Sequence, residues 1–513
     1  MKEIKDKILI IDYGSQYSQL IARRIRELEV YCEITGDTSI ENIDESVKGI
    51  IFSGGPASVY EKDAPSIDKK VFDLNIPILG ICYGMQLITH LNEGTVEKSD
   101  KREFGPAVLE ILEDNILFDS IPKNTNVWMS HGDHITKMGK GFRKIAGTSS
   151  SNAAIANDNN VYALQFHPEV SHSEYGMKMI ENFVFKVCKM EKNWIMKDFI
   201  EEKVKEIKEK TKGEKVLLGL SGGVDSSVAA ALINKAISKD LVCVFVDTGL
   251  LRKDEAKKVK KQYEELNGLN IVYVDAKKRF LDKLKGVKDP EAKRKIIGRE
   301  FIEVFNEEAK KLKEDKEIKF LAQGTIYPDV IESVSVKGPS HTIKSHHNVG
   351  GLPEDLKFEI IEPLRELFKD EVRKLGYRLG LSKEIVGRHP FPGPGLGIRV
   401  IEEVTEEKVR LLQEADEIFI EELIKNDLYD KVSQAFVTIL PVKTVGVMGD
   451  VRTYEYVVSL RSVNTIDFMT AKWSRLPYEL LETVATRITN EVRGVNRVVY
   501  DITSKPSGTI EWE

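Results

Sequence analysis

Two short apolar segments, at residues 76–81 and 216–220, each run straight into a glycine-rich turn that opens a helix. A strand followed by a tight turn and a helix is the repeating unit of a parallel β-sheet covered by helices. The same pattern recurs along most of the chain, so it restricts the fold to the α/β class. Both turns also carry reactive or polar side chains, which makes each of them a candidate site.

Hydrophobic periodicity divides the chain into two strand-and-helix series and a third, different region. In the first series, strands are predicted at 8–11, 49–52, 76–81 and 161–166, with helices at 17–29 and 84–91. A charged stretch at 193–213 has apolar residues at helical spacing and is predicted to be a linker helix. In the second series, strands are predicted at 216–220, 241–246, 270–274, 318–322 and 358–361.

The segment 389–399, His-Pro-Phe-Pro-Gly-Pro-Gly-Leu-Gly-Ile-Arg, is too rich in Pro and Gly for regular structure and marks a boundary. Beyond it, apolar and polar residues alternate at 435–440, 454–460 and 497–502. The sequence therefore predicts an α/β protein with two doubly wound, mostly parallel sheets followed by a smaller α+β domain. The corresponding ranges are 1–192, the linker helix 193–213, 214–388 and 389–513.

Charge and cysteine content exclude several classes of protein. The chain has 76 Lys and Arg against 82 Asp and Glu, a net charge of −6, so it lacks the global positive field that holds nucleic acid. Its four cysteines are scattered, with neither a disulfide framework nor a zinc-type pairing, which fits a reducing compartment. No apolar run approaches membrane-spanning length, and the charged N-terminus lacks the apolar core of a signal peptide. We therefore expect a cytoplasmic protein with neither nucleic acid nor a membrane as partner.

The first glycine-rich turn, Ile-Leu-Gly-Ile-Cys-Tyr-Gly-Met-Gln at 78–86, places Cys82 where a nucleophile is held between a strand and a helix. The oriented N–H groups of a helix N-terminus favour the thiolate, which is the nucleophilic form. His167, which follows a predicted strand, can reach this turn as a base, and Glu169 can orient its ring. The backbone N–H groups of Tyr83 and Gly54 would form the oxyanion hole.

A lone cysteine in such a turn is more often a small buried residue, and a lone His-Pro pair carries little information. Here the Gly-x-Cys-x-Gly turn, an upstream Gly-Gly loop and a downstream His-x-Glu follow one another in the order that a catalytic triad needs. We therefore interpret Cys82, His167 and Glu169 as catalytic and the other cysteines as structural. The N-terminal region resembles the class I glutamine amidotransferases, which implies that Cys82 attacks the side-chain amide of glutamine and releases ammonia through a glutamyl thioester.

The second glycine-rich turn, Ser-Gly-Gly-Val-Asp-Ser-Ser at 221–227, is shorter than a Walker A loop and has no Lys after its second Gly. Backbone N–H groups, hydroxyls and the helix N-terminus can hold phosphate there. A carboxylate beside a polyphosphate is repelled unless a cation bridges the two, so Asp225 indicates Mg²⁺. The alternative is a purely structural Ser/Gly turn in which Ser226 caps the helix and no phosphate binds. The candidate ATP-binding residues are Ser221, Gly222, Gly223, Val224, Asp225, Ser226 and Ser227.

This loop resembles the signature of the ATP pyrophosphatases, which cleave ATP between the α and β phosphates and adenylylate an oxygen of the acceptor. Three further segments narrow the acceptor: Val-Asp-Thr-Gly-Leu-Leu-Arg at 246–252, Ile-Lys-Ser-His-His-Asn-Val-Gly-Gly-Leu-Pro at 343–353, and Lys-Pro-Ser-Gly-Thr-Ile-Glu-Trp-Glu at 505–513. With 389–399, they resemble the glutamine-hydrolysing GMP synthetase family over essentially the whole chain. Ser507 is a conservative departure, because the family usually has a second proline there.

The resemblance implies that ATP adenylylates the C2 oxygen of XMP, and that ammonia then displaces AMP to give GMP, the last step of GMP biosynthesis. Glutamine, ATP and XMP would be the substrates, Mg²⁺ would accompany ATP, and a homodimer would form through the C-terminal domain. Flanking glycines make the 343–353 segment a candidate lid. The candidate XMP-binding residues are Lys344, Arg399, Arg493, Arg497, Lys505 and Glu511.

Three other functions remain open from the sequence. One is an amidotransferase that activates a different carbonyl acceptor, against which the 343–353 segment and the terminal Ile-Glu-Trp-Glu count. A second is an RNA-modifying protein with the same ATP loop, which would need a basic face and, in thiolating members, more cysteines near that loop. A third is a non-catalytic regulator, against which the intact Cys82, His167, Glu169 and Asp225 count.

Overall fold

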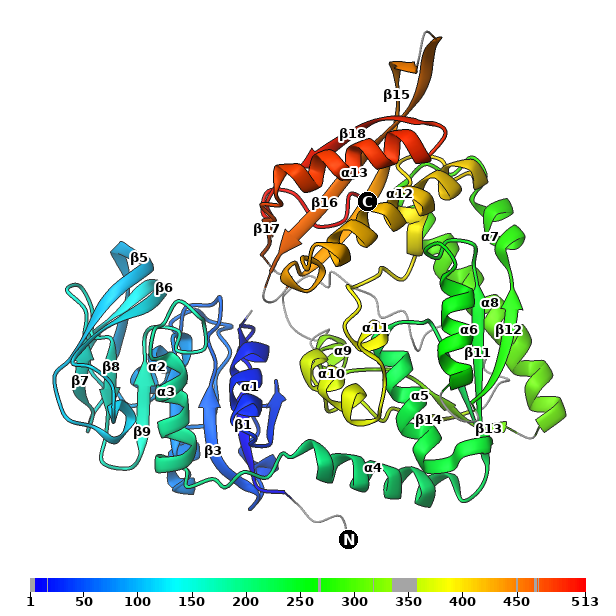
Figure 1. The fold of residues 1–513 in the computed structure, drawn as a ribbon. Helices are drawn as coiled ribbons and strands as arrows, with labels where there is room; N and C mark the ends of the chain where they lie inside the picture. The colour runs from blue at the N-terminus through cyan, green and yellow to red at the C-terminus, as the bar shows by residue number, and fades with distance from the viewer. Residues whose placement is uncertain are drawn as a thin grey trace. The chain divides into compact units, whose positions relative to one another are not determined.

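The structure, a computed structural model, describes residues 5–15, 17–265, 269–316, 318–334, 358–448, 451–465, 468 and 470–513. The described chain forms two compact units (Figure 1). The first unit contains the chain up to Phe199 together with residues 328–334, and the second contains the remainder from Ile200 onward. None of the described helices combines the length and the apolar character that a membrane span requires.

The first unit is built on a nine-stranded sheet with the order β2-β1-β3-β4-β9-β8-β7-β5-β6. The strands from β2 to β9 pair in parallel, and those from β9 to β6 pair antiparallel. The strands are β1 (Lys7–Ile11), β2 (Cys32–Thr35), β3 (Val47–Phe52), β4 (Ile78–Ile81), β5 (Thr95–Ile111), β6 (Asn124–Lys137), β7 (Arg143–Gly147), β8 (Ala154–Ala156) and β9 (Val161–Leu164). The α-helices are α1 (Ser18–Glu27), α2 (Tyr83–Leu91) and α3 (Gly176–Glu181).

The parallel half of this sheet contains the four strands predicted from the sequence, and the predicted α/β class is confirmed. Its strands are apolar because both faces are covered: Ile8, Ile50 and Ile78 are fully buried. The antiparallel half of the sheet was not predicted from the sequence, because its two longest strands, β5 and β6, are partly exposed to solvent. Phe104 and Val108 on β5, for example, are 66% and 59% exposed, so no continuous apolar run marks the strand.

The second unit begins with a five-stranded parallel sheet with the order β12-β11-β10-β13-β14. Its strands are β10 (Lys215–Gly219), β11 (Leu241–Asp247), β12 (Asn270–Asp275), β13 (Ile318–Ala322) and β14 (Glu359–Ile361), at the predicted places. The helices are α4 (Met196–Thr211), which starts before the unit boundary, α5 (Val224–Ile237), α6 (Glu255–Glu265), α7 (Lys277–Leu284), α8 (Pro290–Lys316), α10 (Lys369–Arg378) and α11 (Lys383–Val386). Helix α9 (Tyr327–Val334) begins at the last residue before the chain returns to the first unit, to which residues 328–334 belong.

A third sheet follows, in which β16 pairs antiparallel with β15 and β17 and parallel with β18. Its elements are α12 (Glu406–Lys425), β15 (Gln434–Met448), β16 (Val451–Asn464), β17 (Lys472–Trp473), α13 (Tyr478–Glu491) and β18 (Val495–Asp501). These elements form the predicted α+β region.

The Pro- and Gly-rich segment 389–399 is packed between the two sheets of the second unit. The Leu396 N–H donates to Leu250 O at 2.7 Å, and Leu396 belongs to one hydrophobic core that extends from Leu217 of β10 to Val437 of β15. Gly395 has a φ of 61°, and a Cβ there would lie 2.4 Å from Leu250 O. Glycine is therefore required at this crossing.

Candidate active site

The turn at Cys82 joins β4 to α2 and has a strained backbone. Cys82 has a φ of 53°, in the left-handed region that residues with a Cβ rarely adopt. Two hydrogen bonds fix the turn: the Cys82 N–H donates to Leu164 O at 2.7 Å, and the Gly84 N–H donates to Ser53 O at 3.0 Å. The first ties the turn to β9 and the second to the loop after β3. Strain of this kind at a strand-to-helix turn is how a nucleophile is presented at the edge of a sheet.

Glycines flank the cysteine because neighbouring groups leave no space for a Cβ. At Gly84 a Cβ would lie 2.4 Å from Phe52 O, and at Gly80 it would lie 2.6 Å from Ile88 Cδ1. Both distances are far shorter than a van der Waals contact. The Gly-x-Cys-x-Gly pattern is therefore a steric requirement of this turn.

The structure brings His167 and Glu169 to the same turn. The His167 N–H donates to Trp128 O at 3.0 Å, and Ser173 Oγ donates to His167 O at 2.6 Å, so the backbone after β9 is held. The Cys82 side chain lies close enough to the His167 ring to raise the pKa of that ring, and His167 Nδ1 lies 2.7 Å from Glu169 Oε1. Both His167 and Glu169 are buried. A thiol, an imidazole and a carboxylate linked in this order can perform nucleophilic catalysis.

Opposing influences act on the pKa of the His167 ring. Burial is the largest single influence and favours the neutral ring, whereas the Glu169 carboxylate and the Cys82 sulfur favour the charged ring. The two neighbours together outweigh burial and raise the pKa of His167 well above 6.5. These neighbours therefore favour the protonated ring, whose proton can pass to a leaving group.

The two residues predicted for an oxyanion hole border this cluster. Tyr83 is the first residue of α2, so its N–H has no acceptor within the helix. A Cβ on Gly54 would lie 3.4 Å from His167 Cε1, which places the Gly54 backbone against the imidazole ring. One candidate N–H thus follows the cysteine directly, and the other belongs to a residue beside the histidine.

Two groups close to the sulfur were not predicted from the sequence. Gln165 Nε2 lies 3.9 Å from Cys82 Sγ, and Cys82 Sγ lies 3.7 Å from Ser130 O. Gln165 precedes His167 by two residues in the loop just after β9. Its position two residues before His167 could have identified Gln165 as a candidate from the sequence. Ser130 lies on β6, which was not predicted.

The loop 221–227 joins β10 to α5, and its own polar groups bond one another. Gly222 has a φ of 75°, and Gly223 is the cap of the helix. Ser226 Oγ and Ser227 Oγ donate to Gly223 O at 3.1 and 2.6 Å, and Ser226 Oγ lies 3.0 Å from Ser221 Oγ. Each hydroxyl is therefore held in place at a helix N-terminus, where phosphate binds favourably.

Two cations on this loop were not predicted. Lys369 Nζ lies 2.7 and 2.6 Å from the two carboxylate oxygens of Asp225. Arg388 Nη1 donates to Gly222 O at 2.7 Å, and its Nη2 pairs with Glu255. Lys369 opens α10 and Arg388 follows α11, so only the tertiary structure brings them to the loop.

The groups around Asp225 bear on the prediction that this carboxylate holds Mg²⁺. In the part of the chain that the structure describes, no three His, Cys, Asp or Glu side chains gather as a metal-binding group. Mg²⁺ in nucleotide sites binds only one or two carboxylates and takes its other ligands from phosphate and water. Asp225 suits the role of such a single carboxylate, although here it faces Lys369.

The residues predicted to bind XMP are only partly brought together. Arg399 and Glu511 form a two-pronged ion pair, with Nη2 2.8 Å from Oε1 and Nε 3.1 Å from Oε2. Gln434 Nε2 donates to the same Oε1 at 2.8 Å. The Arg399 side chain is fully buried, and its guanidinium carbon lies 4.1 Å from the centre of the Phe436 ring. The pair is thus fixed at its position from several sides.

The other predicted residues make different contacts. Lys505 Nζ donates to Phe468 O at 2.7 Å, and Arg497 Nε donates to Thr444 Oγ1 at 3.3 Å. Arg493 is exposed after α13 and makes no ion pair with Glu511 among the described residues. Lys344, with the rest of 343–353, lies outside the described residues.

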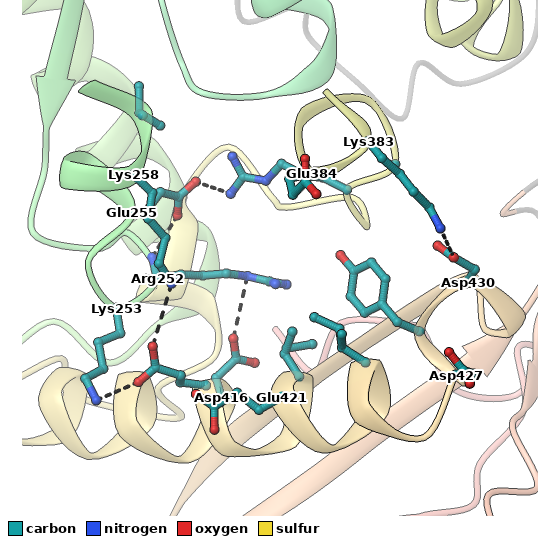
Figure 2. A pocket seen from close by; sticks show the side chains of 17 residues that line it. Arg252, Lys253, Glu255, Lys258, Lys383, Glu384, Asp416, Glu421, Asp427 and Asp430 are labelled. Carbon is teal, nitrogen blue, oxygen red and sulfur yellow. Dashed lines mark hydrogen bonds and ion pairs between the residues drawn. The ribbon is translucent and has the colours of Figure 1, made fainter. Parts of the chain in front are cut away.

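A cavity of about 510 Å³ lies between the 252–259 segment, α11 and α12 (Figure 2). Figure 2 shows the Arg252 side chain reaching across it, with Nε 3.5 Å from Asp416 Oδ2. The Nε and Nη2 groups of Arg252 are buried and lack a hydrogen-bond partner in the described structure. Arg252 and Arg399 both lie over the Phe391 ring, at 5.3 and 5.2 Å. The cavity therefore lies close to the Arg399–Glu511 pair, and Arg388 on its wall also contacts the 221–227 loop.

Comparison with known proteins accounts for the whole chain. Residues 9–187 match the family "Glutamine amidotransferase class-I", residues 194–293 match "NAD synthase", and residues 421–512 match "GMP synthase C terminal domain". The chain is 65% identical to the glutamine-hydrolysing GMP synthase of Fusobacterium nucleatum subsp. nucleatum, over 99% of this chain and 100% of that protein. The chain belongs to the glutamine-hydrolysing GMP synthase family.

Other members of the GMP synthase family are similar over the same length. Those of Spiroplasma kunkelii and Mesoplasma florum are 59% and 60% identical, each over 99% of both chains. The resemblance drawn from the motifs is thereby confirmed, and the matches give no support to the other three functions left open by the sequence. The Cys82 site lies in the first family match, the 221–227 loop in the second and Glu511 in the third.

Proposed function

We propose that this GMP synthase releases ammonia from glutamine at Cys82 and uses it to convert XMP to GMP beside the 221–227 loop. The Cys82 sulfur attacks the carbonyl carbon of the glutamine side chain, which becomes a tetrahedral oxyanion. His167 gives its proton to the amide nitrogen, the carbon–nitrogen bond breaks, and ammonia leaves a glutamyl thioester. Water then attacks the thioester and gives a proton to His167, while glutamate departs and the sulfur regains its charge.

The geometry supports a separate role for each residue. Glu169 fixes the tautomer and orientation of His167 through Nδ1, which leaves the other side of the ring to face the sulfur. The N–H groups of Tyr83 and Gly54 are the candidates for donors to the oxyanion. The single observation that carries the proposal is the buried cluster of Cys82, His167 and Glu169, in which the histidine is hydrogen-bonded to the carboxylate beside a strained turn.

For synthesis, the C2 oxygen of XMP would attack the α-phosphorus of ATP, and pyrophosphate would leave. Ammonia would then attack C2 and lose a proton, and AMP would depart with the former C2 oxygen. The N–H groups and hydroxyls of the 221–227 loop would hold the pyrophosphate, with Lys369 adding a positive charge. Asp225 would hold Mg²⁺ bound to ATP, which supplies charge neutralisation of the phosphates when present.

The cavity of Figure 2 is the best-supported place for XMP. XMP carries a phosphate dianion and carbonyl oxygens, all of which accept hydrogen bonds. Arg252 offers two buried donors that have no hydrogen-bond partner among the described residues, although its Nε lies in ion-pair range of Asp416, and burial makes such donors costly unless a ligand satisfies them. Arg399, Glu511 and Lys505 remain candidates beside it, and the exposed Arg493 gains no support.

A comparison of nitrogen sources tests the proposal. Wild type and Cys82→Ala would each receive ATP, Mg²⁺ and XMP with either glutamine or an ammonium salt, while GMP and AMP are followed. We expect the variant to fail with glutamine and to match wild type with ammonium. Cys188→Ala, which removes another buried thiol from the same unit, is the control and should use both sources. Absence of GMP from wild type with either source would overturn the proposal.

We also propose a homodimer through the β15–β16 hairpin. Val445 and Tyr454 are opposite each other in the register, and they are 59% and 66% exposed, while Val447 is 72% exposed. In Figure 1 the far end of β15 extends beyond β18 and α13. An apolar strand pair of this kind is normally covered by a partner, and in a family of single-chain enzymes a second copy is the natural one.

The mass in solution tests the dimer. Light scattering should give twice the chain mass for wild type and the chain mass for Val447→Glu. Val499→Glu, on β18, adds the same charge at another exposed valine and should stay dimeric. A monomeric wild type, or a dimeric Val447→Glu, would contradict the assignment.

The cysteines support a cytoplasmic location for the enzyme. All four are free and buried, which is usual for a protein that folds under reducing conditions. Their chemistry therefore agrees with an enzyme that needs one free thiol at Cys82.

A further inference from the structure

A fully buried lysine in the second unit has no role in the mechanism above. Lys293 lies in the first turn of α8, and its side chain is 0% exposed. Burying an ammonium group is unfavourable unless it is paired and hydrogen-bonded. Burial lowers the pKa of Lys293, and the Glu513 carboxylate opposes this effect. The buried ammonium group therefore requires partners that compensate for its burial.

Lys293 joins two segments that are far apart in the sequence. Its Nζ donates to Val400 O at 2.7 Å and pairs with the Glu513 side chain. The Glu402 N–H donates to the other Glu513 carboxylate oxygen at 3.1 Å, and Arg294 donates to the Glu513 carbonyl. The tail of the chain is thus attached to α8 and to the 400–402 segment through one residue.

These contacts lie immediately next to the Arg399–Glu511 pair in the sequence. Val400 follows Arg399 directly, and Glu513 is two residues beyond Glu511. The Arg399 backbone is held from its other side by β15, because the Ile439 N–H donates to Arg399 O at 2.9 Å. Lys293, together with the Glu402 N–H, therefore ties the backbone that carries the cation to the backbone that carries the carboxylate, and it is the one side chain that bonds both segments among the described residues.

We propose that Lys293 is a positioning residue for XMP, because it ties Val400 to Glu513 and so sets the spacing of Arg399 and Glu511. The inference rests on the proposed function, in which this pair lies at the XMP site. Lys293 contacts neither the 221–227 loop nor the Cys82 turn through any bond described here. Its loss should therefore weaken XMP binding while ATP binding and glutamine hydrolysis persist.

Lys293→Met tests this directly, since methionine fills a similar volume without the charge. Ammonium-dependent GMP formation would be measured first with varied XMP and then with varied ATP. We expect the KM for XMP to rise roughly 10- to 100-fold, the range produced by misplaced binding groups, with the KM for ATP unchanged. Lys311→Met is the matched control, because Lys311 lies on the same helix, is 66% exposed and pairs only with Glu308 in the described structure. An unchanged KM for XMP, or an equal rise in both KM values, would overturn the inference.

Glu513→Gln provides a second test that does not depend on the folding of Lys293→Met. It keeps the shape of the side chain and removes its charge, so it should raise the KM for XMP and leave that for ATP unchanged. The double variant should be no worse than the worse single variant, because both changes break one contact. Additive losses, or an unaffected Glu513→Gln, would contradict the proposal. Failure of wild type to make GMP from XMP and ammonium would instead overturn the proposed function.

Discussion

The Cys82 site and the 221–227 loop both lie where a parallel strand turns into a helix, but they obtain their partners differently. Cys82 follows β4, and His167 and Glu169 follow β9, which is hydrogen-bonded to β4. The loop at 221–227 obtains Lys369 and Arg388 from α10 and from the end of α11, 144 and 166 residues along the chain. One site is thus assembled by strand pairing and the other by packing of helices.

This difference has a physical consequence. Adjacent parallel strands end at the same edge of a sheet, so their loops meet whatever the helices do. Cations carried on helices reach a loop only when the whole unit is packed. The thiol site should therefore be sensitive to changes within a few residues, and the nucleotide site to changes at distant positions.

Glu169→Gln should have the largest effect and leave the other site intact. The change keeps the shape of the side chain but removes the charge that holds the His167 tautomer. By analogy with serine proteases, glutamine hydrolysis should fall about 10³- to 10⁴-fold. Because the Glu169 charge raises the pKa of His167, the ring should also lose its proton at lower pH, and the alkaline limb of the pH profile should move down.

Glu174→Gln is the control for that change, since Glu174 lies in the same loop and its side chain is exposed. Steady-state release of glutamate against pH would be measured for both variants, together with ammonium-dependent GMP formation. A Glu169→Gln enzyme with unchanged glutaminase activity would show that the carboxylate is not needed.

Gly84→Ala should damage the thiol site through sterics alone. Its Cβ would lie 2.4 Å from Phe52 O, so the turn must shift. We expect roughly 100-fold loss of glutaminase activity from misplacement of the sulfur, and about 1–3 kcal/mol of lost stability from overpacking. Gly36→Ala, where nothing lies within 4 Å of the new Cβ, is the matched control. Thermal unfolding and glutamate release would be compared, and equal behaviour of the two variants would refute the steric argument.

Lys369→Met should affect the opposite site by a smaller factor. It removes the cation on Asp225 and so one of the charges available to the phosphates of ATP. We expect the KM for ATP to rise roughly 10-fold, the effect of losing one charge-assisted contact, with glutaminase activity retained. The exposed Lys374 lies on the same helix, and Lys374→Met should match wild type. If Lys369→Met lost glutaminase activity and kept its affinity for ATP, the contrast between the Cys82 site and the 221–227 loop would be contradicted.

Substitution of His389 should have the smallest effect on catalysis among these changes but a measurable effect on the pH dependence of stability. The ring stacks on Tyr429 at 3.8 Å, accepts from the Ala435 N–H at 3.2 Å through Nδ1, and donates to Tyr429 O at 2.9 Å through Nε2. Burial, aided by the charge of Arg252, lowers the pKa of His389 to about 4. The unfolded ring binds its proton near pH 6.5, so stability is full above that pH and is lost as pH falls toward 4.

This loss should reach about 3 kcal/mol at pH 4 and below, of which about 2 kcal/mol falls between pH 7 and pH 5. Urea unfolding of wild type and His389→Gln at pH 7 and pH 5 would measure it, with the exposed His90→Gln as control. Wild type should lose more stability on acidification than His389→Gln, and His90→Gln should follow wild type. Equal losses in all three would show that the His389 ring does not titrate as described.

The same contrast explains how much the sequence alone predicted. The thiol cluster and every parallel strand except β2 were predicted, because buried strands are continuous apolar runs and their loops meet at one edge, whereas β2 is short and only partly buried. The antiparallel strands β5 and β6 were not predicted, since many of their side chains face solvent, and β7 and β8 were not, because their buried runs are only three residues long. Likewise β15 extends over Gln434–Met448, well beyond the predicted 435–440, because its far end is exposed and has no core pattern.

The residues that the sequence did not predict share one property. Lys293 and Lys369 are cations in ordinary charged surroundings of the sequence, where such residues are usually solvated, and Arg252 and Arg388 lie at the ends of segments in which no single cation stood out. Only tertiary packing distinguishes them, by burying Lys293 completely and by placing Lys369 on Asp225. Arg493 also lies in a stretch of sequence with charged neighbours, but in the structure its side chain is exposed.

The central claim is that nitrogen released at Cys82 becomes the amino group of GMP within one enzyme. The most direct test supplies glutamine labelled with ¹⁵N at the side-chain amide, together with ATP, Mg²⁺, XMP and unlabelled ammonium, and determines the label in GMP by mass spectrometry. Wild type should produce labelled GMP, and Cys82→Ala should produce only unlabelled GMP from the ammonium. Labelled GMP from Cys82→Ala, or unlabelled GMP alone from wild type, would contradict the account.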